Sequence, residues 1–236
     1  MLEIFQRIYR FFFLDIVFAI DAFADQKRKL TASFIFCLFF AFGVFYLWFA
    51  QTHLGQVPLF YQVNYSAPVM MACGFGYHSV DVDLVPHLRD FLQVKIDYFD
   101  CSNIPADVEL RPSWLWQNFY FYLLSMIGLL WKVTGVSWSG LWPYYGALSG
   151  FAALSLFYFF RLGMQSSVAF GCVVLMMMSQ PMRYFFISHY YFIKAPFLFL
   201  SLYIFIRALI DDPKRLLFIS YMSCLGLTLG VSLGFR

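Results

Sequence analysis

The chain has 236 residues, of which 62% are hydrophobic, 23% aromatic and only 12% charged. An ordinary soluble domain carries about 25% charged residues, so this composition excludes a typical soluble globular protein. The 16 Lys and Arg residues against 13 Asp and Glu residues give a net charge of +3. This small excess does not indicate a nucleic-acid partner. We expect membrane lipid to surround the protein, because a spanning helix needs about 20 apolar residues and the chain has room for several.

Residues 1–29 predict an amphipathic helix on the cytoplasmic membrane surface. Polar side chains, among them Glu3, Arg7 and Arg10, fall near one face of such a helix, and Phe and Ile residues fall opposite. A cleaved signal peptide is the alternative. Asp15 interrupts the apolar stretch that a signal peptide requires, and no clear small-residue cleavage site follows it.

Apolar runs predict the spanning helices, and basic residues predict their orientation. Residues 30–50 form the first run, directly after Lys27, Arg28 and Lys29. Basic residues favour the cytoplasmic side of a membrane, so this run leads outward. The stretch that follows holds seven acidic residues between positions 81 and 109, which cannot enter hydrocarbon. We therefore expect it to be extracytoplasmic.

Later apolar runs cover residues 114–131, 138–160, 166–179, 188–210 and 216–236. If residues 114–131 lie along the outer interface, then Arg161, Arg207 and Arg215 fall on the cytoplasmic side, where basic residues are favoured. If residues 114–131 span the membrane, the same three arginines fall outside. The Trp and Tyr residues of that run also suit an interface. We predict an all-α integral membrane protein with about five transmembrane helices. Its parts are a first helix over 30–50, a large first extracytoplasmic loop with juxtamembrane helices over 51–137, and a four-helix transmembrane bundle over 138–236.

Two short helices are predicted inside the loop. Residues 66–77 indicate a turn, a helix and an exit through glycines. Asp83 can cap a second helix with Pro86 in its first turn. Leu88 and Phe91 would then share an apolar face that rests on the membrane.

Cys73 and Cys101 are the two cysteines of the loop. They would lie in the one compartment where thiols are oxidised, so we predict a disulfide that stabilises the loop by about 3 kcal/mol. Two unpaired buried thiols are the alternative. The five cysteines of the chain form no CxxC spacing, so no zinc or iron–sulfur site is expected.

A first group of candidate functional residues is His78, Asp81 and Asp83, which stand close together in the loop. An imidazole and two carboxylates could act as a general base or hold a divalent cation. The alternative is a helix cap with a solvated carboxylate beside it.

A second group lies in the predicted outer connection between two later spans and consists of Arg183, His189 and Lys194. Cations at headgroup depth beside aromatic rings suit a polyprenyl phosphate or diphosphate. Lys194 is the most informative of them, because Pro196 frees backbone groups next to a cation within an apolar run. Snorkelling of Arg183 and Lys194 to the interface is an equally good interpretation.

The last apolar run carries Gly226, Gly230 and Gly234 at four-residue spacing. Such a stripe lets a neighbouring helix approach closely, and that helix could belong to a partner membrane protein.

The passage WKVTGVS at residues 131–137 leads into the apolar run 138–160 and then into Arg161-Leu162-Gly163. Ser179-Gln180-Pro181, an outer turn, a run ending near Arg207 and glycines at 226–230 follow in order. This pattern, over most of residues 30–236, resembles the amino-terminal module of GT-C membrane glycosyltransferases, the group of protein O-mannosyltransferases and lipid A aminoarabinose transferases.

The resemblance implies transfer of a sugar from a polyprenyl-phosphate donor at the extracytoplasmic face of a multi-pass protein of the bacterial inner membrane. Asp81 or Asp83 would be the catalytic base, and Arg183 and Lys194 would clamp the phosphate. The chain departs from the family at residues 65–68 (YSAP), where the family has an acidic residue. A non-catalytic membrane subunit of a larger complex that retains the architecture is therefore the alternative.

Overall fold

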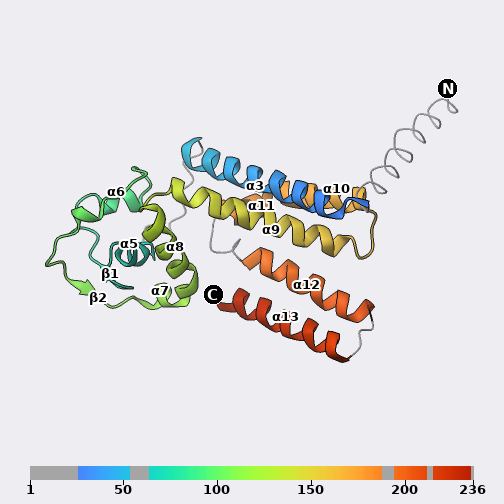
Figure 1. Cartoon of the computed structure of the whole chain (residues 1–236). Helices are drawn as coiled ribbons and strands as arrows, with labels where there is room; N and C mark the ends of the chain where they lie inside the picture. The colour runs from blue at the N-terminus through green and yellow to red at the C-terminus, as the bar shows by residue number, and fades with distance from the viewer. Residues whose placement is uncertain (1–25, 54–63, 188–193, 212–214, 235–236) are drawn as a thin grey trace, which may run out of the picture.

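The computed structural model describes residues 26–53, 64–187, 194–211 and 215–234. Within these ranges the chain is mostly helical, with ten α-helices and one two-stranded sheet. This confirms the helical class predicted from the sequence. Figure 1 shows two parts, a module of short helices and strands at one end and a bundle of longer helices beside it. Most of the surface helix predicted for residues 1–29 falls outside the described residues.

The bundle is formed by five long apolar helices and the short α11. They are α3 (Arg28–His53), α9 (Trp142–Phe160), α10 (Ser166–Met178), α11 (Gln180–Ile187), α12 (Ala195–Ile210) and α13 (Arg215–Gly234). α9 packs along α3 and also along α12, and α13 packs on α12 (Figure 1). α3 is the one described helix that is long and apolar enough by itself to cross a membrane, with a mean hydropathy of 2.2.

One helix of the bundle corrects an expectation from the sequence. Residues 180–187 were expected in a short connection, but they form α11. Ser179 has an extended backbone that ends α10, and its hydroxyl accepts a hydrogen bond from the Met182 amide at 3.4 Å. A hydroxyl that accepts from an amide three residues later is typical of a helix start. Pro181 is compatible with the first turn, because amides there have no partner within the helix and proline has no amide hydrogen to pair.

Glycines bring α3 and α9 into close contact. A Cβ atom placed on Gly146 would lie 2.6 Å from Val44 Cγ2, and one on Gly150 would lie 2.9 Å from the carbonyl oxygen of Phe36. A Cβ on Gly43 of α3 would lie 2.7 Å from Ser149 Cβ. These separations are shorter than van der Waals contact, so larger side chains would push the two helices apart.

The module holds the remaining elements. They are α5 (Ser66–Ala72), β1 (Ser79–Val80), α6 (Leu88–Leu92), η2 (Cys101–Asn103), β2 (Leu110–Arg111), α7 (Leu115–Phe119), α8 (Phe121–Thr134) and η3 (Ser139–Leu141). The strands are antiparallel, with Ser79 opposite Arg111 and Val80 opposite Leu110. α8 packs on α5, and Gly128 permits this approach because its Cβ would lie 3.2 Å from the Pro68 carbonyl oxygen.

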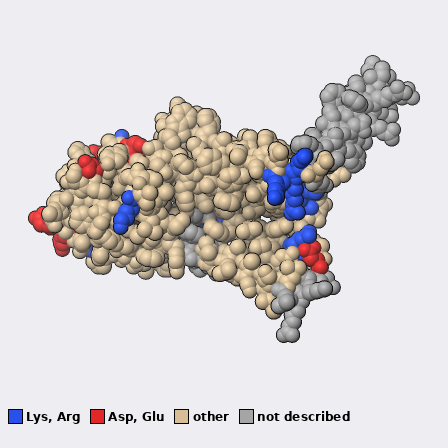
Figure 2. Space-filling model, viewed as in Figure 1, with Lys and Arg blue, Asp and Glu red and all other residues tan. Residues whose placement is uncertain are grey.

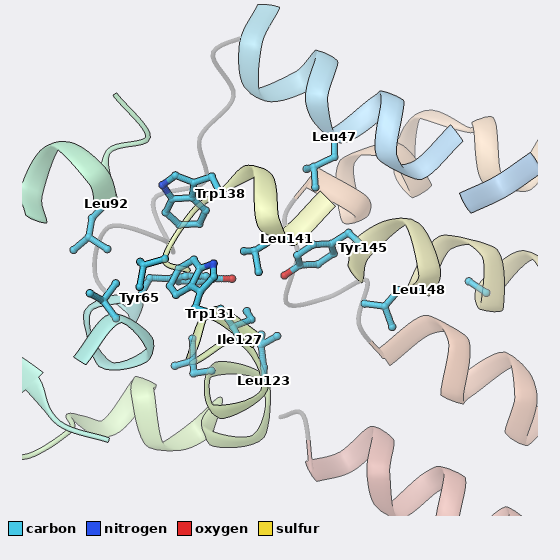
Figure 3. Packing of buried hydrophobic residues seen from close by; sticks show 14 of the residues in the cluster. Leu47, Tyr65, Leu92, Leu123, Ile127, Trp131, Trp138, Leu141, Tyr145 and Leu148 are labelled. Carbon is cyan, nitrogen blue, oxygen red and sulfur yellow. The ribbon is translucent and has the colours of Figure 1, made fainter. Parts of the chain in front are cut away.

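Aromatic side chains form the core of the module (Figure 3). Trp131, Trp138, Tyr65 and Phe91 are all buried. The Phe91 and Trp138 rings stack with centroids 5.0 Å apart, and Tyr65 lies 5.3 Å from Trp138. The buried indole groups have backbone partners, since Trp138 Nε1 donates to the Phe91 carbonyl at 2.8 Å and Trp131 Nε1 donates to the Ser137 carbonyl at 2.7 Å. These bonds offset the cost of burying the two N–H groups.

The helix predicted to start at Asp83 is wrong in its position. α6 begins at Leu88, after His87 in a left-handed conformation with φ 62°. The Asp81 carboxylate accepts from the Asp83 amide at 3.1 Å, which closes a turn where the helix start was expected. Leu88 and Phe91 are buried in the module core rather than turned toward a membrane.

A disulfide links Cys73, directly after α5, to Cys101 in η2, with the Cα atoms 5.4 Å apart. The structure therefore contains the predicted pair rather than two unpaired thiols. Cys37, Cys172 and Cys224 are free cysteines. The disulfide ties η2 to the end of α5, the helix that packs on α8.

Two polar contacts hold the start of α9 to its surroundings. Asp97 accepts from the backbone amide of Ser139 at 2.9 Å and from its hydroxyl at 2.5 Å, at the first residue of η3. Trp142 Nε1 donates to Gln51 Oε1 at 2.7 Å and so joins the start of α9 to the end of α3. The first contact lies within the module, just before α9 begins, and the second joins two helices of the bundle.

Candidate functional site

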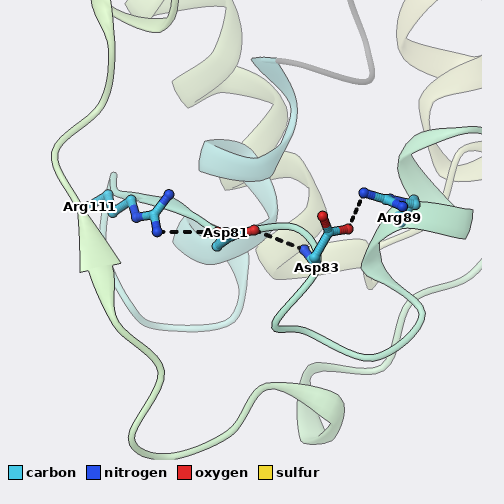
Figure 4. A network of polar contacts seen from close by, with 4 residues as sticks. All are labelled: Asp81, Asp83, Arg89 and Arg111. Carbon is cyan, nitrogen blue, oxygen red and sulfur yellow. Dashed lines mark hydrogen bonds and ion pairs between the residues drawn. The ribbon is translucent and has the colours of Figure 1, made fainter.

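The two carboxylates predicted as a catalytic base lie in the segment between β1 and α6 (Figure 4). Asp81 forms an ion pair with Arg111 of β2 at 3.2 Å, and Asp83 forms one with Arg89 of α6. Both pairs face solvent, with 35% of the Asp81 side chain and 59% of the Asp83 side chain exposed. The arrangement links β2, the turn and α6, so the geometry is that of a surface ion-pair network.

His78 does not complete a site with these carboxylates. Its Nδ1 atom lies 3.1 Å from the Phe75 carbonyl oxygen, which directs the ring back along its own loop. In the part of the chain that the structure describes, no group of three His, Cys, Asp or Glu side chains is placed to hold a metal ion. The divalent cation considered at the sequence level therefore has no set of ligands at His78, Asp81 and Asp83.

Other carboxylates of the module also have structural contacts. Asp90 pairs with Lys95 at 3.4 Å, and Asp97 binds the start of η3. Asp100 accepts from the Ser102 amide at 2.9 Å, and this bond holds the pKa of Asp100 below its usual range. Asp107 and Glu109 are exposed or nearly so. None of these arrangements places a carboxylate in a water-excluded cavity, where a general base acts most effectively.

Buried phenols of the module do not supply a base either. Burial raises the pKa of Tyr65 and that of Tyr77 well above their usual range. The Tyr77 hydroxyl donates to the Gln117 carbonyl at 2.7 Å. Both phenols therefore stay protonated at neutral pH and are poor bases.

The second predicted group is placed in part. Arg183 is an exposed residue of α11, and Lys194 is partly buried at the residue before α12, whose first turn contains Pro196. His189 lies outside the described residues. In the sequence the two described cations thus lie on either side of residues 188–193, Arg183 within α11 and Lys194 directly before α12.

Two glycines of the predicted stripe have no close neighbour in this chain. A Cβ atom on Gly226 or on Gly230 would meet nothing within 4 Å, and Gly234 is the last residue of α13. α13 contacts α12 through another face, where the Ser201 hydroxyl donates to Thr228 Oγ1 at 2.8 Å. Within the described residues, glycines permit close helix packing at Gly43, Gly146 and Gly150 between α3 and α9, and at Gly128 between α5 and α8.

Sequence reasoning missed a cluster of three arginines at the other end of the bundle. Arg28 of α3, Arg161 at the end of α9 and Arg207 of α12 line one cavity of about 300 Å³. From the sequence, Arg161 and Arg207 contributed to the predicted orientation and to the family resemblance, but not to a predicted site. The predicted orientation placed these arginines on the same side of the membrane, and this was the one sign in the sequence that they could lie close together. Only the packing of α3, α9 and α12 brings them to one cavity.

Comparison with protein-family models, with curated proteins and with solved structures finds no match to this chain. The assignment of function therefore depends on the residues and their arrangement.

Proposed function

We propose that α3, α9, the α10–α11 pair, α12 and α13 cross a membrane and that the module lies on its extracytoplasmic side. Large apolar side chains exposed along the bundle support this placement, including Phe34, Phe45, Leu202 and Leu227. In water such a surface would be costly, whereas in lipid it is the expected exterior. α3, at 26 residues, has a length of about 39 Å, which exceeds a hydrocarbon core of about 30 Å.

Two independent features support the orientation. Disulfides persist in oxidising compartments, so the Cys73–Cys101 bond favours a module outside the cytoplasm. Arg28, Arg161 and Arg207 gather at the end of the bundle away from the module, where the positive-inside tendency favours the cytoplasm. α8 lies in the module beside α5, and its exposed Leu129 and Val133 suit the outer interface.

The orientation can be tested by labelling in intact cells. A chain with Cys37, Cys172 and Cys224 replaced by Ser would receive one new cysteine, at Ser113 of the module or at Lys29 of α3. A membrane-impermeant maleimide should label Ser113→Cys in intact cells and Lys29→Cys only after lysis. The reverse pattern would contradict the orientation.

We further propose that the chain is a non-catalytic integral membrane subunit of GT-C-like architecture. The observation that carries this proposal is the position of Asp81 and Asp83 in exposed ion pairs with Arg111 and Arg89. A transferase needs a carboxylate beside the acceptor hydroxyl, and these two already neutralise neighbouring cations. The open side of Gly226 and Gly230 supports a partner helix against α13.

A sugar transferase that uses a polyprenyl-phosphate donor is the second candidate. It is favoured by Lys194, a partly buried cation at the start of α12, with Arg183 at the preceding helix. A cation at that depth suits a lipid phosphate. Under this proposal Lys194 binds the donor and the base is a residue other than Asp81 or Asp83.

One purification distinguishes the two candidates. The full chain, extracted in mild detergent, would be analysed by native mass spectrometry for bound proteins and bound lipids. The subunit proposal expects a stoichiometric partner protein and no polyprenyl phosphate. The transferase proposal expects a retained polyprenyl phosphate that is lost in Lys194→Ala and kept in Lys132→Ala, which removes the same charge from the exposed face of α8.

A further inference from the structure

The arginine cavity lies where the ends of four helices meet. Arg28 and Thr31 come from the start of α3, Arg161 from the end of α9, Ser166 from the start of α10 and Arg207 from the end of α12. The rings of Tyr158 and Tyr203 also line it, with their centroids 5.9 Å apart. Figure 2 shows basic side chains gathered at this end of the bundle, remote from the module.

Arginine side chains give this cavity a positively charged lining. Three arginines line it, and none of the lining residues that the structure describes is a carboxylate. Arg207 also pairs with Asp211 at 2.7 Å. The Arg28 guanidinium lies over the Tyr158 ring at 5.3 Å from its centroid, so an aromatic face rather than a carboxylate holds it.

Two further features favour an anion in this cavity. The buried Ser166 is the first residue of α10, so the amino-terminal turn of a 13-residue helix borders the cavity. Amide groups in such a turn lack internal partners and favour negative charge. Arg161 is oriented at the same place, because its guanidinium donates to the Met164 carbonyl at 2.9 Å.

We propose that Arg28, Arg161 and Arg207 form a binding site for a phosphate group, with the α10 amino terminus completing it. Guanidinium groups bind phosphate oxygens through paired hydrogen bonds, and three converging arginines suit one such group. The volume of about 300 Å³ is at the lower limit for small-ligand sites and fits a headgroup rather than a whole lipid. The phosphate comes from an anionic phospholipid or from a soluble phosphate compound.

The site goes beyond the function proposed above. Its position in the cytoplasmic headgroup layer depends on the proposed orientation, but recognition of phosphate does not. Failure of the labelling experiment would move the site to the other leaflet and leave its chemistry intact.

The test uses the full chain in detergent and compares phosphatidylglycerol with phosphatidylcholine by native mass spectrometry. The variants are Arg28→Gln and Arg207→Gln, made separately. Lys29→Gln is the matched control, because it removes a charge one residue from Arg28 at a side chain that does not line the cavity. The unfolding midpoint without added ligand checks that each variant folds.

Phosphatidylglycerol should be retained in preference to phosphatidylcholine, and Arg28→Gln should lower that retention about tenfold, the loss expected for one charge-assisted hydrogen bond. Lys29→Gln should retain the lipid as the unaltered chain does. If inorganic phosphate instead raises the unfolding midpoint of the unaltered chain but not of Arg28→Gln, the ligand is a soluble phosphate. Equal losses in Arg28→Gln and Lys29→Gln, or no response to either ligand, would overturn the proposal.

Discussion

The contact between α3 and α9 allows a quantitative test of helix packing in this protein. In Gly150→Ala the new methyl group would lie 2.9 Å from the Phe36 carbonyl oxygen and 2.8 Å from Phe36 Cδ2. The side chain can rotate, but the backbone oxygen moves only if the helices separate. Overpacking of this kind costs about 1–3 kcal/mol.

Gly230→Ala provides the control that isolates this steric cost. The exchange of glycine for alanine in a helix by itself favours folding by about 1 kcal/mol. This gain applies at both positions, whereas a Cβ on Gly230 meets nothing within 4 Å. The difference between the two variants should therefore be about 2 kcal/mol, or roughly 30-fold in the unfolding constant.

The assay is unfolding of the detergent-solubilised chain by increasing fractions of sodium dodecyl sulfate, followed by far-ultraviolet circular dichroism. Gly150→Ala should unfold at a lower fraction than the unaltered chain, and Gly230→Ala at an equal or higher one. Coincident curves for the two variants would refute the close packing of α3 on α9. If a protein that copurifies with the unaltered chain is lost in Gly230→Ala, that protein binds at the glycine face of α13.

Three further outcomes are expected in the module. Cys73→Ser should destabilise it by about 3–4 kcal/mol, because the bond closes a sequence separation of 28 residues; equal unfolding curves with and without reductant would contradict this. Asp97→Ala should cost about 1 kcal/mol, because Ser139 loses its capping carboxylate, and an unchanged midpoint would exclude that role. The pKa of Asp100 is lower in the folded chain than in the unfolded chain, so the Asp100 carboxylate stabilises the fold fully at any pH above its unfolded pKa. This stabilisation is lost as the pH falls through the lower pKa of the folded chain. The stability of Asp100→Asn should therefore depend less on pH in that range, and the same pH dependence as in the unaltered chain would contradict a stabilising role for this carboxylate.

The helical segments were accessible to sequence reasoning because their signals are local. The apolar run 138–160 and the proline in its first turn correspond to α9, and the run 30–50 corresponds to α3. The glycine exit after residues 66–72 is also present, with φ of 93° at Gly74. Each of these features depends on residues within a few positions of one another.

The contacts of Asp81 and Asp83 could not be predicted from the sequence, because their partners are not set by the local pattern. Asp83 has the residue type and position of a helix cap, but Arg89 binds its carboxylate and Asp81 binds its amide. Arg111 reaches Asp81 only because β2 pairs with β1. A pattern of neighbouring acids therefore could not distinguish a catalytic pair from a surface ion-pair network.

The sequence by itself determined a helical, strongly apolar protein and the approximate bounds of its long helices, since composition and continuous apolar runs carry that information. Tertiary structure decided which glycines meet a neighbouring helix and which arginines share a cavity. α3 and α9 are apolar on all sides, so hydropathy does not indicate which face of either helix turns inward. That rotation places Gly146 and Gly150 against α3 and brings Arg28, Arg161 and Arg207 together.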